Sequence, residues 1–225
     1  MRVAGGTGAV TDDADQRSVL VVEDDGLMRD LIARSLELRG FVVETAASAA
    51  DAKRAFGRLD PDGAVIDIEL GAGPNGFDLA EALRASAPYL AIVFLTHLPD
   101  ARFAERDPQA LPSGIAYLRK SALTDVDTLV TTLDHVMRGA PDPVRHDLDP
   151  QRPLASLTRK QVEVLRLIAQ GLTNADIAKR RGVSVKAVED TVGRICAVLE
   201  LDAGAEVNLR VTAARRYLEA TSAAT

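Results

Sequence analysis

Five short apolar runs alternate with segments of helical periodicity between residues 18 and 138, and this alternation restricts the possible folds more than any other feature of the chain. The runs cover residues 19–22, 41–45, 63–66, 91–95 and 114–117. The segment after the first run places apolar residues at the spacing of one helical face: Leu27, Leu31, Ile32 and Leu36. A second such face follows the last run: Leu129, Val130, Leu133, Val136 and Met137. Strands that alternate with helices predict a parallel sheet covered on both faces.

Five strands joined by crossovers predict an α/β fold, specifically a flavodoxin-like doubly wound (βα)5 domain over residues 18–138. In such a fold, ligands bind beyond the carboxyl ends of the strands. One crossover departs from the pattern, because residues 99–113 contain three prolines. A proline in a helix interior costs about 3 kcal/mol. We therefore expect the fourth helix to be short or broken.

A second, smaller domain follows a break in both periodicities. Residues 139–156 hold four of the ten prolines, and we interpret them as an interdomain linker. Residues 157–225 are predicted to be all helical, and residues 1–17 are expected to form a solvated tail.

The helical domain begins with a clear capping signal. Thr158 and Gln161 have the spacing of a capping box, and Gly171 is the expected end of that first helix. Thr173 is expected to open a second, short helix that ends near Gly182. Ser184 is expected to cap a third, with an apolar stripe made by Val188, Val192, Ile195 and Leu199. A helix, a short turn and a helix are typical of a DNA-reading module.

Polar side chains stand directly after the predicted strands. Glu23 and Asp24 follow the first strand and Asp67 follows the third. Thr96 follows the fourth strand, and Lys120 comes shortly after the fifth. Converging carboxylates repel one another unless a cation neutralises them, and oxygen ligands of this kind suit Mg²⁺. A carboxylate here could attack a phosphoryl donor, with Lys120 and Thr96 stabilising the transferred charge.

Four segments resemble the signatures of receiver domains: Val-Leu-Val-Val-Glu23-Asp24-Asp25, Val-Ile-Asp67-Ile-Glu69-Leu, Phe-Leu-Thr96 and Ala-Tyr117-Leu-Arg-Lys120. The resemblance covers residues 18–138. It implies that Asp67 accepts a phosphoryl group from a histidine kinase. It also implies an Mg²⁺ site formed by Glu23, Asp24, Asp67 and the backbone carbonyl of Glu69. Thr96 would be the switch hydroxyl, Tyr117 the aromatic residue that follows it, and Lys120 the lysine that pairs with phosphate.

Two features depart from the receiver pattern. The loop 69–76 lacks the usual proline position and is one residue longer, so the metal-site loop is expected to differ. His97 replaces a small residue, which predicts crowding at the phosphate entrance and slow dephosphorylation. Single acidic residues at strand ends are also often helix caps, and for Asp25 we prefer that reading.

Residues 155–218 resemble the LuxR-type helix-turn-helix of NarL/FixJ regulators, in the run from Leu157 to Ala178 and in Ser184-Val-Lys-Ala-Val188. Asn174 and Lys179 are expected to face the DNA backbone. The exposed positions of the third helix would read bases: Lys186, Glu189, Asp190, Gly193 and Arg194. The two acidic residues in that set are unusual, because a carboxylate can accept a hydrogen bond from cytosine but is repelled by phosphate.

Charge is distributed unevenly between the two parts of the chain. Residues 1–150 contain 15 Lys and Arg against 25 Asp and Glu, whereas residues 151–225 contain 12 against 8. A basic C-terminal part suits double-stranded DNA. No apolar run approaches the roughly 20 residues of a membrane span, and we expect a cytoplasmic protein without a membrane partner. Cys196 is the single cysteine, so neither an internal disulfide nor a Cys/His metal cluster is expected.

These observations lead to one main hypothesis and two alternatives. The chain is expected to be a two-component response regulator that regulates transcription, forms a homodimer when active, and is not an enzyme in the ordinary sense. One alternative is a phosphorylation-independent DNA-binding regulator whose receiver is only a scaffold, as His97 and the altered loop suggest. The other is a signalling adaptor whose C-terminal helices bind protein, as Glu189 and Asp190 suggest.

Overall fold

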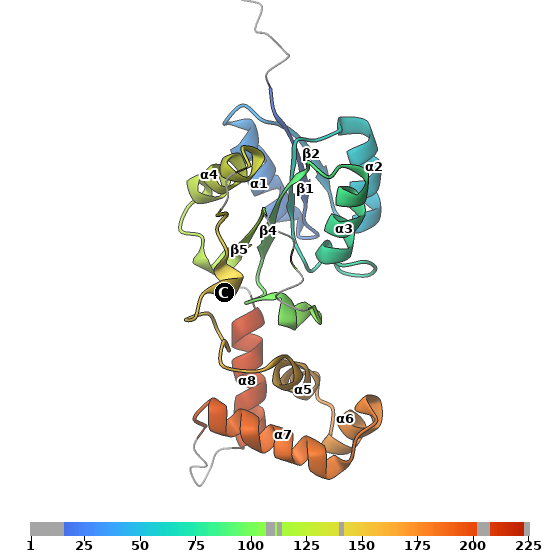
Figure 1. Ribbon diagram of the computed structural model, residues 1–225, viewed down its shortest axis with the longest axis vertical. Helices are drawn as coiled ribbons and strands as arrows, with labels where there is room; N and C mark the ends of the chain where they lie inside the picture. The colour runs from blue at the N-terminus through green and yellow to red at the C-terminus, as the bar shows by residue number, and fades with distance from the viewer. Residues whose placement is uncertain (1–15, 107–110, 112–113, 140–141, 202–207, 223–225) are drawn as a thin grey trace, which may run out of the picture.

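A computed structural model describes residues 16–106, 111, 114–139, 142–201 and 208–222. The predicted tail therefore lies outside the described residues, except for its last two positions. The chain forms a sheet-containing lobe and a smaller helical lobe (Figure 1). A five-stranded parallel sheet has the order β2-β1-β3-β4-β5. Its strands are β1 (Ser18–Val22), β2 (Val42–Ala46), β3 (Gly63–Ile66), β4 (Ala91–Thr96) and β5 (Ile115–Arg119).

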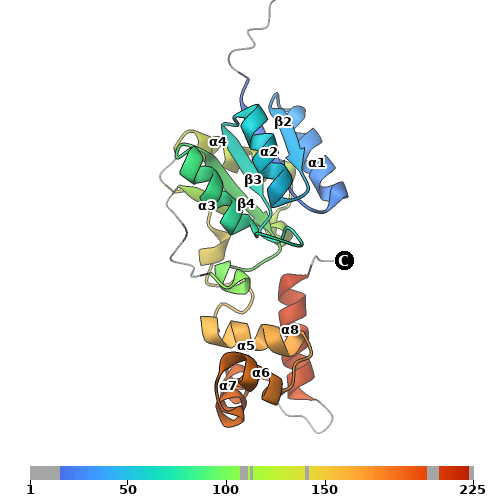
Figure 2. The same cartoon turned by 90° about the vertical axis from the view of Figure 1, so that its right-hand side faces the viewer.

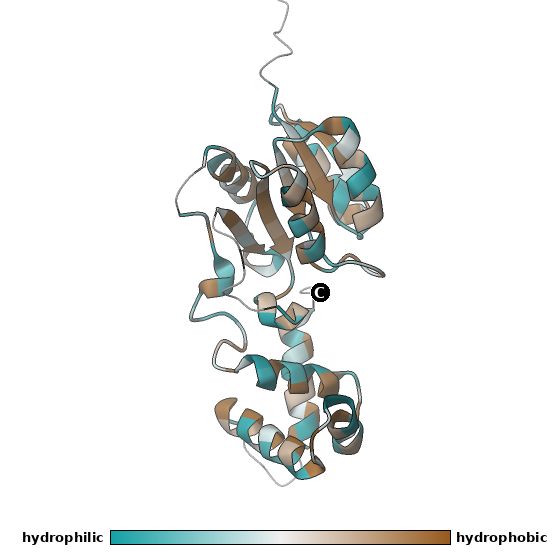
Figure 3. Cartoon of the chain, turned by 45° about the vertical axis from the view of Figure 1, so that its right-hand side comes forward, coloured by the Kyte–Doolittle hydropathy of each residue, from teal (hydrophilic) through white to brown (hydrophobic). Residues whose placement is uncertain are grey.

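Helices cover both faces of the sheet, as predicted. One face carries α1 (Gly26–Glu37) and α4 (Val126–Met137), and the other carries α2 (Ala49–Leu59) and α3 (Gly76–Ser86) (Figure 1). Alternate side chains of each strand enter the two cores, so that Val19 and Val21 pack with α1 and α4 whereas Leu20 and Val22 pack with α2 and α3. Figure 3 shows the strands as an apolar layer between helices of mixed hydropathy.

The α1 helix differs from its predicted face. Ile32 and Leu36 are buried, but Leu27 is 83% exposed and Leu31 is 53% exposed. Leu31 lines a groove between α1 and the start of α4 instead, whereas Leu27 is not part of that groove and faces solvent. The predicted face of α4 is confirmed at its centre, where Leu129 and Leu133 are buried.

In its described part, the crossover between β4 and β5 lacks a regular α-helix, as its prolines indicated. Its described part contains one 3-10 turn, η1 (Ala101–Ala104). Asp100 caps that turn, and Glu105 ends it with a left-handed backbone of φ 62°. Residues 107–110, 112 and 113 of this crossover lie outside the description.

The predicted linker is packed against the sheet. After the 3-10 turn η3 (Lys120–Ala122) and α4, the chain returns to β5, where the backbone N–H of Tyr117 donates to Val144 O at 2.8 Å. The N–H of Arg119 donates to His146 Nδ1 at 3.2 Å. In the 3-10 turn η4 (His146–Leu148), the fully buried Asp147 accepts two hydrogen bonds from Arg145. The linker therefore covers the outer edge of β5.

The helical lobe contains α5 (Arg159–Ala169), α6 (Asn174–Arg181), α7 (Val185–Val198) and α8 (Leu209–Thr221). The Thr158–Gln161 capping box is present, and both Thr173 and Ser184 cap the helices expected of them. Of the α7 stripe, Val188 and Ile195 are buried. The bounds of α8 were not predicted from the sequence, and this helix packs along α5 through Ala213 and Tyr217. None of the helices in the described ranges is long and apolar enough to cross a membrane.

Candidate functional site

Three carboxylates meet at the carboxyl end of the sheet. One oxygen from each of Glu23, Asp24 and Asp67 lies within 4.8 Å of the others. The N–H of Asp67 donates to Val22 O at 2.8 Å, which ties the end of β3 to the end of β1. Glu23 and Asp67 are buried, whereas Asp24 is exposed. The cluster thus offers hard oxygen ligands on its solvent side and a buried floor, an arrangement that fits Mg²⁺ with some of its waters.

Lys120 closes this cluster from the β5 side. Its Nζ lies 2.7 Å from Asp67 Oδ2 and 2.7 Å from Glu23 Oε2, and its side chain is only 6% exposed. Burial favours the neutral amine, but the charge of Asp67 and hydrogen bonds to both carboxylates outweigh it and raise the pKa of Lys120. Lys120 therefore stays protonated and neutralises part of the carboxylate charge.

Burial of Glu23 changes its affinity for a proton. Burial raises its pKa to about 7, and the neighbouring charge of Asp67 also raises it, while the Lys120 hydrogen bond acts in the opposite direction. A cation that entered the cluster would replace the proton on Glu23.

The predicted switch residues, Thr96 and Tyr117, both form a hydrogen bond with Leu98. Thr96 is fully buried at the end of β4, and its Oγ1 accepts the N–H of Leu98 at 3.3 Å. Tyr117 is also fully buried, and its hydroxyl donates to Leu98 O at 3.0 Å. Both side chains therefore hold the same residue, Leu98, although Tyr117 lies inside the core and outside the crevice.

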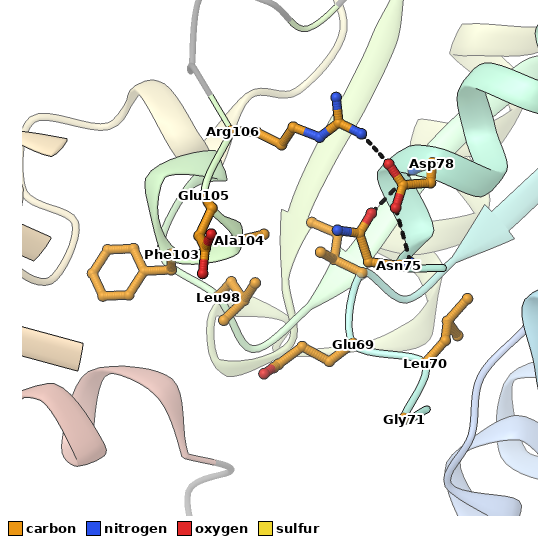
Figure 4. Close-up of a pocket in the computed structure, with 11 residues that line it drawn as sticks. Glu69, Leu70, Gly71, Asn75, Asp78, Leu98, Phe103, Ala104, Glu105 and Arg106 are labelled. Carbon is orange, nitrogen blue, oxygen red and sulfur yellow. Dashed lines mark hydrogen bonds and ion pairs between the residues drawn. The ribbon is translucent and has the colours of Figure 1, made fainter. Parts of the chain in front are cut away.

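The long loop after Asp67 folds back toward the cluster. A Cβ on Gly71, whose φ is 70°, would lie 3.6 Å from Asp24 Oδ2. The N–H of Glu69 donates to Asp67 Oδ1 at 3.1 Å. The Glu69 side chain extends toward η1, and together with Asn75, Leu98 and Phe103 it lines a pocket of about 590 Å³ (Figure 4).

His97 stands beside the cluster with a buried ring nitrogen. Within the described residues, its Nδ1 has no hydrogen-bond partner. Burial lowers the pKa of His97, and the charge of Lys120 lowers it further. The ring is therefore neutral near pH 7.

One residue that braces the acidic loop was not predicted from the sequence. Arg29, in the first turns of α1, donates through Nη1 to Glu23 O at 2.7 Å and to Asp24 O at 3.3 Å. The sequence did contain a signal for this role, because Arg29 lies in the first turn of the helix that directly follows the acidic pair.

The third helix of the C-terminal lobe presents its predicted recognition residues to solvent. Lys186, Glu189, Asp190, Gly193 and Arg194 are all exposed. Lys186 pairs with Asp190 at 2.9 Å, and Arg194 Nε donates to Asp190 O at 3.1 Å. Of the two acidic side chains of α7, Asp190 has an ion-pair partner and Glu189 has none among the described residues.

The two residues of α6 that were predicted to face the DNA backbone differ in their exposure to solvent. Lys179 is exposed, but Asn174 is partly buried and its Oδ1 accepts from Arg210 Nη1 at 2.7 Å. Arg210 also donates to Leu172 O. Arg210 of α8, which the sequence analysis did not select, therefore fixes the start of α6.

Comparisons with known proteins identify both lobes. The family model described as response regulator receiver domain matches residues 19–134. The model of bacterial regulatory proteins of the luxR family matches residues 155–206.

Two relatives match most of the chain. The chain is 29% identical to the DNA-binding transcriptional activator DevR/DosR of Mycobacterium tuberculosis, over 88% of this chain and 95% of that protein. It is 31% identical to a nitrate/nitrite response regulator protein homolog of Haemophilus influenzae, over 78% of this chain and 86% of that protein. Among solved structures, a complex of the response regulator RcsB with DNA shares the fold at 19% identity and TM-score 0.54, over 92% of this chain and all of that one.

Proposed function

The chain belongs to the two-component response regulators of the NarL/FixJ type, and from this we propose that phosphorylation of Asp67 by a histidine kinase controls how its C-terminal domain binds double-stranded DNA. The observation that carries the proposal is the position of Asp67, which lies buried between an acidic pair and a protonated lysine at the open end of the sheet. The members of this family are transcriptional regulators. We therefore propose that the chain has no catalytic activity beyond its own phosphorylation and dephosphorylation.

The proposed chemistry is a phosphoryl transfer to the carboxylate of Asp67. A carboxylate oxygen attacks phosphorus, the bond from phosphorus to the donor's imidazole nitrogen breaks, and the electron pair leaves with the imidazole. Lys120 stays close to the transferred group, because its ammonium already lies 2.7 Å from Asp67 Oδ2. The hydroxyl of Thr96, freed from Leu98, would donate to a phosphoryl oxygen.

We propose that Glu23, Asp24, Asp67 and the carbonyl of Glu69 hold Mg²⁺. The ion would offset the negative charge of the phosphoryl group during transfer. The residues fit this role, because their three carboxylates supply converging hard oxygens and Asp24 leaves one side open to water. Arg29 keeps the Glu23 and Asp24 backbone in place.

We propose the following domain boundaries and roles. Residues 18–138 form the receiver, 139–156 the linker and 157–225 the DNA-binding domain, with residues 1–17 as a tail. In the DNA-binding domain, Lys179 would contact the phosphate backbone and the exposed residues of α7 would contact bases. Asn174 would act through its amide N–H₂, since its oxygen is taken by Arg210. Active protein would bind as a homodimer, in the cytoplasm, where the proposed DNA partner lies.

The test is to label the full chain with a small phosphodonor in the presence of Mg²⁺ and to trap the product with borohydride. Mass spectrometry should place the label on Asp67 and on no other residue, and Asp67→Asn should remove it. Asp25→Asn is the matched control, because Asp25 is an exposed cap of α1 in the same loop. Label on another residue, or equal label in Asp67→Asn, would refute the proposal. DNA binding that is equal with and without label would favour the alternative of a scaffold receiver.

A further inference from the structure

The segment that follows Thr96 makes polar contacts with the linker and with the DNA-binding domain. At its centre, the fully buried carboxylate of Asp100 accepts hydrogen bonds from Arg102 Nε at 2.8 Å and Nη2 at 2.6 Å. Arg152 of the linker donates to the same carboxylate at 2.7 Å. Burial would raise the pKa of Asp100, but the hydrogen bonds from both arginines outweigh burial and lower it. The charged cluster is therefore fully formed at neutral pH.

Arg102 connects this cluster to the DNA-binding domain. Its guanidinium donates to Leu157 O, directly before α5, and to Leu154 O at 3.3 Å. The side chain of Arg102 is 7% exposed. A planar, buried guanidinium with five donors can bond both oxygens of a carboxylate and two carbonyls at once.

The next residues continue the contact onto α5 and α8. The ring of Phe103 stacks on Tyr217 of α8, with centroids 5.6 Å apart and an interplanar angle of 26°. Glu105 pairs with Arg166 of α5, and Arg159 donates to Glu105 O at 2.7 Å. Within the four residues 102–105, the chain thus contacts both α5 and α8.

The same segment begins at the proposed switch. Leu98 donates its N–H to the hydroxyl of Thr96 and accepts the hydroxyl of Tyr117 on its carbonyl. If Thr96 turned its hydroxyl toward a phosphoryl group on Asp67, Leu98 would lose its acceptor. Asp100 follows two residues later, so a displacement of Leu98 would also move Asp100 and the two arginines that bind it.

The contacts of this segment leave the recognition helix open. They end on residues 154–166 and on Tyr217, while α7 lies at the far end of the helical lobe from the sheet (Figures 1 and 2). The side chains of Lys186 and Asp190 are 76% and 51% exposed, and Glu189 and Arg194 are exposed as well.

We propose that residues 98–105 couple Thr96 to α5 and α8 and do not shield α7, so that the unphosphorylated full-length chain already binds DNA. Phosphorylation then acts by repositioning α5 and α8, and this second clause rests on the proposed function. The surface that the segment holds is the scaffold of the DNA-binding domain, and its DNA-contacting face stays available throughout.

The first experiment measures the coupling without phosphorylation. Amide hydrogen exchange of the full chain is compared for wild type, Phe103→Ala and Tyr217→Ala. Both variants should speed exchange in α5 and α8 by at least fivefold and leave the sheet strands unchanged. Unchanged exchange in α5 and α8 would overturn the proposal. Arg102→Gln should act in the same way, and Arg106→Gln is its matched control, because Arg106 pairs with Asp78 inside the receiver.

The second experiment measures DNA affinity of the unphosphorylated full chain. Because α7 is open, Phe103→Ala should change affinity for a nonspecific duplex by less than threefold at fixed salt. A gain of tenfold or more would show that the segment shields α7, and it would overturn the proposal.

The third experiment adds a phosphodonor. Phe103→Ala should be labelled at Asp67 like wild type, yet phosphorylation should no longer change its DNA affinity. A full response in Phe103→Ala would refute the coupling role. Absence of label in wild type would refute the proposed function instead, while the exchange and affinity experiments still decide the coupling.

Discussion

Gly76, the first residue of α3, packs directly against the backbone of Asp67: a Cβ at position 76 would lie 2.2 Å from the carbonyl oxygen of Asp67 and 2.8 Å from the Cα of Ile68. The N–H of Gly76 also donates to Ile68 O at 2.9 Å. The backbone that carries the proposed phosphoacceptor therefore has no room for any side chain at position 76.

Gly76→Ala should destabilise the receiver, because either α3 or the end of β3 must move. We expect a loss of about 1–3 kcal/mol, the usual cost of overpacking. Gly57→Ala is the matched control, since Gly57 lies within α2 with open space around its Cβ position. Alanine there should stabilise by about 0.5–1 kcal/mol. Urea unfolding of both variants checks the prediction, and equal effects would contradict the close packing.

Mg²⁺ binding should strengthen as pH rises through 7. In the folded protein the pKa of Glu23 is about 7, above its ordinary value of 4.5. Such a carboxyl is protonated in the fold below pH 7, so its ionisation weakens the metal-free fold as pH rises from about 4.5 to above 7. Mg²⁺ offsets this loss by binding the ionised form. The rise in Tm on adding Mg²⁺ should therefore be larger at pH 8 than at pH 6.

Glu23→Gln separates this effect from general pH dependence. Glutamine cannot ionise, so the Mg²⁺-induced shifts in Tm at pH 6 and pH 8 should differ by less than in wild type, and Glu69, whose pKa burial also raises to about 7, accounts for the remaining difference. A variant that keeps the wild-type difference would show that another group controls metal binding.

Arg210 should contribute more stability than the neighbouring arginines of α8. It donates to Asn174 Oδ1 and to Leu172 O, and hydrogen bonds from a charged group contribute about 1.5–3 kcal/mol. Arg210→Ala should lower the free energy of unfolding of the DNA-binding domain by about that amount. Arg215→Ala is the control, because the ion pair of Arg215 is with exposed Glu219 and such pairs contribute about 0–1 kcal/mol. Denaturant unfolding distinguishes the two.

Glu189→Lys should show whether the acidic recognition helix reads bases. If Glu189 accepts a hydrogen bond from cytosine, the reversal should change which sequences the full chain prefers, at about 1–3 kcal/mol for the affected base pair. If it only opposes phosphate, all duplexes should bind more tightly. Glu219→Lys adds the same charge on α8 and should do neither. Binding to a randomised duplex pool at two salt concentrations checks both outcomes.

Lys179→Ala should weaken binding to all sequences by a similar factor and reduce the salt slope by about one, as expected for a single phosphate contact. Lys186→Ala and Arg194→Ala should also change base preference. Lys186 pairs with Asp190, so its removal frees a carboxylate on the recognition face. The same randomised pool measures all three variants, and a change of base preference in Lys179→Ala would contradict its assignment to the backbone.

The fold could be predicted because its signals are local. Apolar alternation predicted all five strands to within two residues at each end, and capping residues such as Thr158 and Ser184 predicted where α5 and α7 begin. Glu23, Asp67 and Lys120 follow the ends of parallel strands, which predicted that they meet at the carboxyl end of the sheet. The distances between them agree with this prediction.

Apart from the local contacts of Arg29, the interactions that were not predicted join residues far apart in the chain. Arg102 and Leu157 are 55 residues apart, and Arg210 and Asn174 are 36 apart. No local pattern shows that an arginine in a proline-interrupted crossover will serve as an interdomain contact. Exposure of Leu27 and Leu31 was missed for a related reason, since helical periodicity gives the direction of a face but not where the partner surface ends.

The docking of the linker on β5 has a consequence for dissecting the protein. A fragment that ends at residue 138 would leave the N–H groups of Tyr117 and Arg119 without their acceptors, Val144 O and His146 Nδ1. An open strand edge of this kind is a template for self-association. The folding unit of the receiver therefore extends past residue 138, the boundary that sequence periodicity indicates. Residues 144–147 cover the edge of β5 and so protect it from pairing with another chain.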